Sequence, residues 1–361
     1  MAPLDRLELP PRLVDWSILA AVGVALATGL TSLVSGQPGE AFVFVLHGIG
    51  GLSLVLLLFW KLRRVRRRIT TGAAWDRATP VSVLLATAAL GALATGTYWA
   101  FGGSLDLGPW GLLNLHIGLG LLVVPLLVYH LRHRFRVPST ADFEGRRTAL
   151  SYAAVVGVGA LAWRLQGAAN ALLDTAGARR RFTGSREKGT DGGNGFPVTS
   201  WVADDPEPVD TETWALSVDG RVARPLELGY GDVDSETDAA LDSDGRRALL
   251  DCTSGWYSEH DWRGRSVGDL LDAADADPDA RWVSFRSVTG YRWSLPLPEA
   301  RAALLATHVD GERLSHGHGF PLRLVAPGRR GFQWVKWVER VEVTKKRDLS
   351  EWLAVFVSGF D

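Results

Sequence analysis

The sequence predicts an N-terminal transmembrane α-helical bundle of about five helices, followed by an α+β, strand-rich C-terminal domain. Five apolar stretches, each close to the ~20 residues that a helix needs to cross a bilayer, occupy the first 170 residues. Short strand-like segments begin only after about residue 194. The charge also changes, because residues 1–200 carry 11 acidic and 20 basic residues, whereas residues 201–361 carry 29 acidic and 19 basic residues.

The apolar stretches are expected to be membrane-spanning helices at residues 13–34, 41–60, 79–101, 110–131 and 148–166. Basic loops at 61–68 and 132–136 follow the second and fourth stretches, and the two intervening connections contain no basic residue. The positive-inside rule therefore predicts a multi-pass cell-membrane protein with a cytoplasmic N-terminus and an extracytoplasmic C-terminal half. The basic cluster at 179–181 opposes this orientation. The membrane topology accounts for the basic residues between the apolar stretches, so nucleic acid is not an expected partner.

A two-helix unit occurs twice in this bundle. Ala25-Leu-Ala-Thr-Gly29 recurs as Ala92-Leu-Ala-Thr-Gly96, and Leu46-His47 recurs as Leu115-His116. Each histidine lies six residues inside its span, about 9 Å below the outer end, so the two imidazoles are expected at one depth. Two such imidazoles can bind a haem iron from both faces and support single-electron transfer. The alternative is a pair of histidines that only hydrogen-bond across helices; the matched positions favour one haem b held by His47 and His116.

A second haem is not expected. His130 lies 14 residues after His116 and returns to the same helix face, but the matching position on the second span is Lys61. His133 shares a helix with His130, and two such residues cannot ligate one haem from opposite faces. Residues 10–135 resemble the cytochrome b-type membrane subunits of redox enzymes, which implies membrane lipid and quinone or quinol as partners.

The fifth span begins with a pair of arginines. Arg146-Arg147-Thr-Ala-Leu150 precedes a short, weakly apolar run and resembles a twin-arginine export signal. That pathway suits a domain that receives its cofactor before export. Two arginines that merely flank an ordinary helix are the alternative.

The predicted domains are a four-helix haem b-type bundle at 1–135, the fifth helix at 136–170, a polar linker at 171–194 and an extracytoplasmic domain at 195–361. Within the last domain, strands are expected at 214–222, 282–286, 322–325 and 338–343, with a short helix at 267–274.

The single cysteine, Cys252, follows an apolar segment that runs into a glycine-containing turn. One cysteine excludes an internal disulfide and a cysteine-rich metal cluster. A thiol at a strand end can become a thiolate ligand for a metal, although a buried inert cysteine is the commoner case.

The surrounding motifs favour the ligand. The segment Cys252-Thr-Ser-Gly-Trp-Tyr-Ser-Glu-His-Asp-Trp262 closely resembles the molybdenum-ligand segment of the sulfite-oxidase-type molybdopterin family. Downstream, His318-Gly-Phe-Pro-Leu-Arg323 and the later Lys336 match that family's second signature. The resemblance covers about residues 194–345. It implies a molybdenum–molybdopterin cofactor with Cys252 as the metal ligand and cofactor-binding positions at His318, Arg323 and Lys336. Asn194-Gly-Phe-Pro197 resembles the family's opening loop, which can touch the cofactor.

The departures from the family bear on the reaction. Animal and plant sulfite oxidases have an arginine pair after the cysteine, whereas this chain has Trp256 and Tyr257, which we expect at the catalytic site. With these aromatic residues the substrate site resembles that of the bacterial reductases of this fold, which act on sulfoxides. The sequence therefore predicts an oxidoreductase that passes quinol electrons through the haem to molybdenum and reduces a small-molecule or protein sulfoxide. The alternative enzyme oxidises sulfite or a similar anion and delivers electrons to quinone. A haem protein whose outer domain only binds partners is disfavoured by the presence of Cys252.

Overall fold

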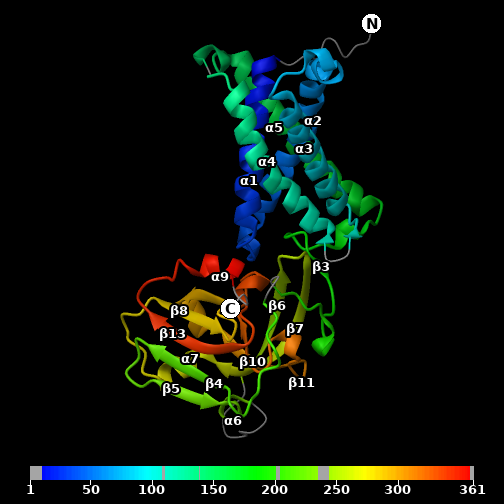
Figure 1. Ribbon diagram of the computed structural model, residues 1–361. Helices are drawn as coiled ribbons and strands as arrows, with labels where there is room; N and C mark the ends of the chain where they lie inside the picture. The colour runs from blue at the N-terminus through cyan, green and yellow to red at the C-terminus, as the bar shows by residue number, and fades with distance from the viewer. Residues whose placement is uncertain (1–9, 108–109, 138, 201–203, 235–243, 358–361) are drawn as a thin grey trace. The chain divides into compact units, whose positions relative to one another are not determined.

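The computed structural model describes residues 10–107, 110–137, 139–200, 204–234 and 244–357 (Figure 1). The chain divides into two compact units, Met1–Gly184 and Ser185–Asp361. The division falls inside the stretch 171–194 that we expected to be a linker.

The first unit contains five long helices, and each is long and apolar enough to cross a membrane. They are α1 (Pro11–Ser32), α2 (Ala41–Thr70), α3 (Thr79–Ala100), α4 (Leu112–Arg134) and α5 (Arg146–Leu172). Proline in the first turn starts α1 and α3, because its fixed φ fits a helix and its missing N–H needs no partner there. The predicted fold of the N-terminal half is confirmed.

The helices are arranged as two antiparallel hairpins with one added helix. α1 packs along α2, α3 packs along α4, and α5 packs against α2. The approach of α5 to α2 is close, because a Cβ on Gly159 would lie 2.0 Å from the Ser53 hydroxyl oxygen. The basic stretch 61–68 that we expected to be a loop is instead the end of α2, since arginine and lysine are good helix formers.

Short elements connect these helices. They are the 3₁₀ turns η2 (Pro38–Glu40), η3 (Gly72–Ala74), η4 (Thr140–Asp142) and η5 (Ala176–Arg179), and the paired strands β1 (Asp106–Leu107) and β2 (Trp110–Gly111).

The second unit is built on two mixed sheets. The first sheet has the strand order β11-β10-β7-β3; in addition, β12 pairs with β10 and β6 pairs with β7. Its strands are β3 (Arg186–Glu187), β6 (Asp244–Cys252), β7 (Trp256–Ser266), β10 (Leu304–Val309), β11 (Glu312–Arg313) and β12 (Arg323–Val325). The second has the order β5-β4-β13-β8-β9, formed by β4 (Ala215–Gly220), β5 (Leu226–Gly229), β8 (Trp282–Ser287), β9 (Arg292–Pro296) and β13 (Val338–Thr344). This mixed-sheet architecture confirms the predicted α+β domain.

Short helices join the strands of the second unit: η6 (Gly193–Gly195), α6 (Tyr230–Val233), α7 (Val267–Ala273), α8 (Leu297–Arg301), η7 (His316–His318), η8 (Gly331–Gln333) and α9 (Glu351–Val357). Ser266 caps α7 by accepting a hydrogen bond from the Asp269 backbone N–H, as expected for serine at a helix start. The core between the strands holds large aromatic side chains that are fully buried, among them Trp262, Trp293, Trp334 and Phe285. This core holds the strand ends that carry the site.

Candidate functional site

Cys252 is the last residue of β6 and lies directly opposite Trp256, the first residue of β7. The tight connection depends on Gly255, whose φ of +90° is readily adopted only by glycine. The Cys252 side chain is buried, and its sulfur accepts a 3.5 Å hydrogen bond from the Ser254 backbone N–H. Gly331 lies against the cysteine, because a Cβ there would be 3.0 Å from the Cys252 Cα. The strand end therefore holds the thiol in one place.

A buried ion pair supports the backbone at this strand end. Arg330 Nη1 lies 2.8 Å from Asp251 Oδ1, and Arg330 Nη2 donates to the Cys252 carbonyl at 3.3 Å. The Ser185 hydroxyl donates to the same Asp251 carboxylate at 2.7 Å. The side chains of Arg330, Asp251 and Ser185 thus hold the backbone of Asp251 and Cys252 in place.

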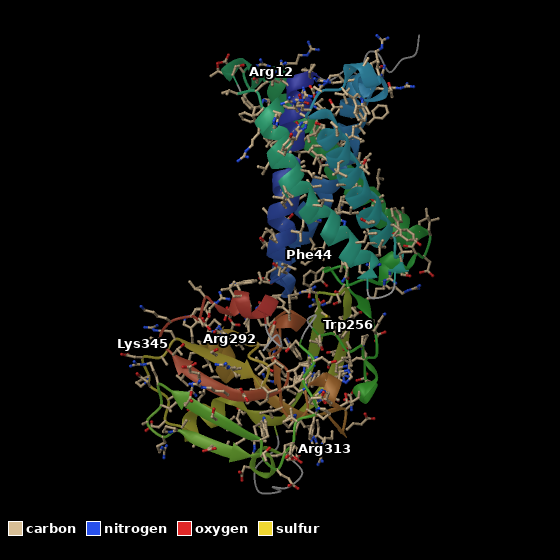
Figure 2. All side chains as sticks on the ribbon, in the orientation of Figure 1. Arg12, Phe44, Trp256, Arg292, Arg313 and Lys345 are labelled. Carbon is tan, nitrogen blue, oxygen red and sulfur yellow. The ribbon has the colours of Figure 1, made fainter. Side chains whose placement is uncertain are left out.

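The two predicted aromatic residues lie on opposite faces of the β6–β7 hairpin. Directly paired residues share a face, so Trp256 is on the side of Cys252, and Tyr257 is on the side of Asp251. Trp256, labelled in Figure 2, is buried and donates from its indole N–H to Thr199 at 3.2 Å. Tyr257 is only half-buried, because side chains alternate along β7. The structure brings Trp256, but not Tyr257, to the face of Cys252.

Arg323, in β12, is a buried guanidinium with few protein partners. Its Nη1 donates to the His318 carbonyl at 2.8 Å, and its Nε has no hydrogen-bond partner among the described residues. Burial lowers the pKa of Arg323 to about 10, and the Cys252 thiolate acts in the opposite direction. The two predicted residues are therefore close enough for their charges to interact.

Lys336 is the second buried cation. Its ammonium donates to the Ser200 hydroxyl at 2.7 Å and to the Gly317 carbonyl at 3.0 Å. The pKa of Lys336 is lowered to about 7. Burial is the largest cause and the charge of Arg323 adds to it, whereas the charges of Asp204, Asp205 and Cys252 act in the opposite direction. The described residues place no carboxylate within salt-bridge distance of either Arg323 or Lys336.

These two cations fit an anionic cofactor. A buried charge without a partner is costly, and phosphate oxygens are acceptors that form charge-assisted hydrogen bonds with arginine and lysine. A buried thiol lies within the electrostatic reach of both. The residues present therefore fit a molybdopterin whose phosphate lies among the cations and whose metal takes the sulfur.

His318, in η7, is fully engaged by the protein. The Phe196 carbonyl can only accept, so His318 Nε2 carries the proton in their 2.9 Å hydrogen bond, and Nδ1 accepts from Ser315 at 2.7 Å. Burial lowers the pKa of His318 to about 4, so the ring is neutral near pH 7. Its ring lies 3.9 Å from that of Phe196, centre to centre. In this geometry His318 positions the Phe196 loop and, through its carbonyl, Arg323.

Asn194 lies in the same loop and is also engaged by the protein. Its side chain donates to Glu312 at 3.1 Å and to the Arg313 carbonyl at 2.9 Å, and it accepts from the Ser315 backbone N–H at 2.8 Å. These bonds tie the loop to β11 and to the start of η7.

The structure brings His47 and His116 together inside the helical unit. Their ring centres are 6.0 Å apart at an interplanar angle of 82°. His47 Nδ1 lies 3.0 Å from the Ala25 carbonyl, and His116 Nδ1 lies 2.8 Å from the Ala92 carbonyl. Because a carbonyl only accepts, each Nδ1 carries the proton and each Nε2 keeps its lone pair, which is the usual tautomer of a metal-bound histidine.

The internal repeat explains this symmetry. Thr28 and Thr95 approach the same ring nitrogens at 3.2 Å and 3.5 Å. Gly29 and Gly96 leave room for the rings, because a Cβ would lie 3.4 Å from His47 Cε1 and 2.8 Å from His116 Cε1. Both rings line one cavity, so the residues present fit a haem iron between them.

Several residues of the site were missed from the sequence. Phe196 packs on His318, Ser200 binds Lys336, and Arg330 holds the backbone of Cys252. Arg330 follows Arg329, a half-buried residue paired with Glu299, and nothing in the sequence distinguishes the two arginines. Ser200 carries no sequence signal, whereas Phe196 lies in the Asn194 motif that had been singled out.

Comparison with known proteins agrees with this site. Residues 203–352 match the family described as the oxidoreductase molybdopterin binding domain. The oxidoreductase YuiH of Bacillus subtilis (strain 168), described as uncharacterized, is 31% identical over 160 residues, which cover 44% of this chain and 78% of the relative. The chain belongs to the molybdopterin-binding oxidoreductase family. It is an enzyme of the sulfite oxidase type, preceded by five apolar helices.

Two further similarities cover smaller parts of the matched proteins. The catalytic subunit of the protein-methionine-sulfoxide reductase MsrP of Gluconobacter oxydans (strain 621H) is 30% identical over 158 residues, which cover 38% of this oxidoreductase and about half, 49%, of the relative. The structure of the sulfane dehydrogenase SoxCD from Paracoccus pantotrophus matches with a TM-score of 0.36 and 23% identity, over 40% of this chain and 41% of that one.

Proposed function

We propose that this membrane-anchored oxidoreductase takes electrons from quinol, passes them through a haem held by His47 and His116, and reduces a sulfoxide at a molybdenum site. The observation that carries the proposal is the position of Cys252 within electrostatic reach of two buried cations, Arg323 and Lys336. Neither cation has a carboxylate within salt-bridge distance among the described residues. Buried positive charges beside a fixed thiol match the needs of a metal cofactor that ends in a phosphate.

At the molybdenum site the chain would supply a metal ligand, two cations that bind the cofactor's phosphate and an apolar side chain beside the substrate. Cys252 would hold the metal, and Arg323 and Lys336 would bind the phosphate. The bound cofactor would supply the two-electron transfer that converts a sulfoxide, with two electrons and two protons, into a sulfide and water. Trp256, buried on the Cys252 face, would form an uncharged wall beside the substrate. His318 and Asn194 would act by positioning the loop rather than by direct contact.

The haem assignment is supported by the matched environments of His47 and His116. Each ring donates to an alanine carbonyl of the repeated Ala-Leu-Ala-Thr-Gly segment, and each therefore presents an unprotonated Nε2. We place the basic ends of α2 and α4 in the cytoplasm and the second unit outside it, as the positive-inside rule suggests.

The substrate class is supported by the MsrP relative, whose name gives it as a protein-methionine-sulfoxide reductase. An uncharged tryptophan beside the cysteine suits a neutral sulfoxide better than an anion such as sulfite, because an anion requires cationic partners.

Turnover of purified, molybdenum-loaded protein against sulfoxides, N-oxides and sulfite tests the proposal. We expect sulfoxide reduction with a dye donor, and loss of both turnover and the Mo(V) paramagnetic signal in Cys252→Ser with haem absorbance retained. Full activity in Cys252→Ser would exclude the molybdenum assignment. Oxidation of sulfite without sulfoxide reduction would reverse the proposed direction of electron flow.

A further inference from the structure

The helical unit contains one long cavity that reaches well beyond the histidine pair. It has a volume of about 740 Å³ and is lined by α1, α2, α3 and α4. His47 and His116 line one part of it, and His130, 14 residues further along α4 than His116, lines another. That separation corresponds to about 21 Å of helix, so the cavity is far longer than the histidine pair requires.

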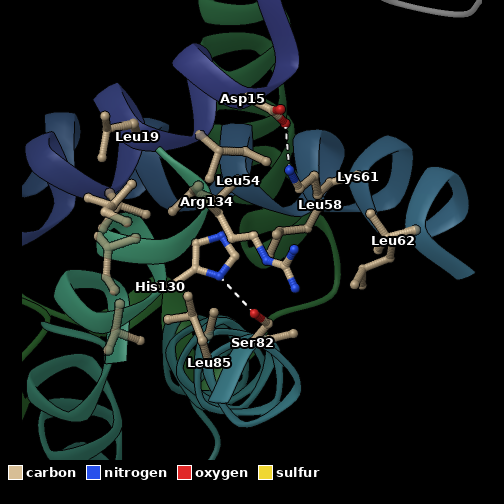
Figure 3. A pocket seen from close by; sticks show the side chains of 18 of the residues that line it. Asp15, Leu19, Leu54, Leu58, Lys61, Leu62, Ser82, Leu85, His130 and Arg134 are labelled. Carbon is tan, nitrogen blue, oxygen red and sulfur yellow. Dashed lines mark hydrogen bonds and ion pairs between the residues drawn. The ribbon is translucent and has the colours of Figure 1, made fainter. Parts of the chain in front are cut away.

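The walls of the far part combine leucines with charged side chains from the basic ends of α2 and α4, among them Arg68 and Arg134. Leu19 of α1, Leu54, Leu58 and Leu62 of α2, and Leu85 of α3 line it, as Figure 3 shows. These helices are the candidate membrane spans, so the leucines are compatible with a lipid-soluble molecule.

A histidine in a fixed tautomer faces this part of the cavity. Ser82 donates its only hydroxyl hydrogen to the Ala78 carbonyl at 2.8 Å. The 2.9 Å bond between Ser82 Oγ and His130 Nδ1 therefore has the histidine as donor (Figure 3). With Nδ1 protonated, the neutral ring keeps its lone pair on Nε2, which makes His130 a base.

A carboxylate lines the same cavity. Asp15 of α1 accepts from Lys61 of α2 at 2.8 Å (Figure 3). It also accepts from Arg64 of α2 at 2.5 Å. The Asp15 side chain is 45% exposed and lies about one turn from the start of α1. A carboxylate thus lines the same cavity as a fixed base.

We propose that this part of the cavity is a quinol-oxidation site, with the ring between His130 and Asp15 and the tail along the leucines. The inference rests on the proposed function and names where its electron donor binds. The quinol loses two electrons and two protons and becomes the quinone. One hydroxyl proton goes to His130 Nε2 and the other to the Asp15 carboxylate. A haem held by His47 and His116, which line the same cavity, would accept the electrons one at a time.

A second haem is the competing occupant, and the cavity does not favour it. His130 and His133 are the imidazoles of the far part among the described residues, and both are on α4. His133 Nδ1 is bonded to the Tyr129 carbonyl at 3.0 Å, on its own helix. The residue of α2 that corresponds to His130 in the repeat is Lys61, whose ammonium binds Asp15.

The test is binding of decylubiquinol and of menadiol, whose hydroxyl groups can donate to His130 Nε2 and to the Asp15 carboxylate. Binding to the dithionite-reduced full chain in detergent is measured by titration calorimetry. We expect His130→Ala and Asp15→Asn to weaken binding about tenfold or more, because each removes one polar partner of the ring. Thr87→Ala is the matched control: Thr87 is on α3, as Ser82 is, but it does not line the cavity. Haem absorbance after dithionite reduction checks that each variant is folded.

Unchanged binding in both variants, with the haem of the wild type still reduced by quinol, would overturn this site and leave the proposed function intact. A wild-type chain that neither binds the quinols nor accepts electrons from them would overturn both. Two haems per chain by pyridine haemochrome, with one lost in His130→Ala, would assign the cavity to a second haem instead.

Discussion

The Arg330 guanidinium and the Asp251 carboxylate form a buried ion pair, 2.8 Å apart, immediately beside the cysteine that ends β6. The side chains are 5% and 3% exposed, and Arg330 also donates to the Cys252 carbonyl. Removing one partner of such a pair leaves an uncompensated charge in the interior. Arg330 therefore combines two roles, in the stability of the second unit and in the position of the proposed molybdenum ligand.

Arg330→Met is expected to lower the free energy of unfolding of the second unit by about 3–5 kcal/mol, because the buried Asp251 carboxylate loses the guanidinium that lies 2.8 Å from it. Denaturant titration followed by tryptophan fluorescence measures the change. Arg329→Met is the control, since its pair with Glu299 is on the surface and should contribute less than about 1 kcal/mol. An equal decrease in the free energy of unfolding in the two variants would mean that the buried pair stabilises the unit no more than the surface pair does.

Lys336 is expected to make the stability of the cofactor-free protein depend on pH. Its pKa is about 7 in the fold and about 10.4 in the unfolded chain, so between these values the unfolded state binds the extra proton. Stability should therefore rise with pH, by about 2–3 kcal/mol between pH 7.5 and 9.5. The measurement is denaturant unfolding of protein made without molybdopterin.

Lys336→Met should abolish this rise, because the unfolded and folded states then bind the same number of protons at this position. Bound phosphate should also flatten it, since an anion beside the ammonium favours the charged form. A slope that persists in Lys336→Met would assign the titration to another group. Lower molybdopterin content in Lys336→Met and Arg323→Met would support the phosphate contact, and unchanged content in both would remove it.

Trp256 and Tyr257 should differ in their effect on catalysis, although they are neighbours in the chain. Trp256 shares the face of Cys252, whereas Tyr257 shares the face of Asp251. We expect Trp256→Phe to lower kcat/KM for a sulfoxide about tenfold, a change of about 1.4 kcal/mol, and Tyr257→Phe to change it less than about twofold. Steady-state kinetics with a dye donor provides the comparison. The reverse order of effects would place the substrate on the other face of the hairpin.

The sequence predicts the framework of this protein better than its site. Apolar length identifies the spans, because a helix in lipid must satisfy its own backbone, and this constraint acts on every residue of a span. The end of α2 was missed because the charges at 61–68 were taken to mark a loop, whereas basic residues also extend helices.

The site depends on relationships that a linear pattern does not contain. Trp256 and Tyr257 are adjacent in the sequence, but alternation along β7 places successive side chains on opposite faces. His318 matched a motif position, yet its partners Phe196 and Ser315 belong to the tertiary structure. The histidine pair was accessible from sequence because a repeat encodes the same contacts twice, through Ala25 and Ala92.

The last prediction concerns that pair. His47→Ala and His116→Ala should each remove the low-spin b-type absorbance, because a single imidazole cannot ligate the iron from both sides. Quinol-driven turnover should stop, while turnover with a dye that donates directly to molybdenum should continue, since Cys252 and its surroundings belong to the other unit. His133→Ala is the control, because its ring is exposed and bonded within its own helix turn. Reduced-minus-oxidised spectra of the four proteins decide the assignment. If the haem persists in both single variants, its ligands are elsewhere, and His130 is the first residue to test.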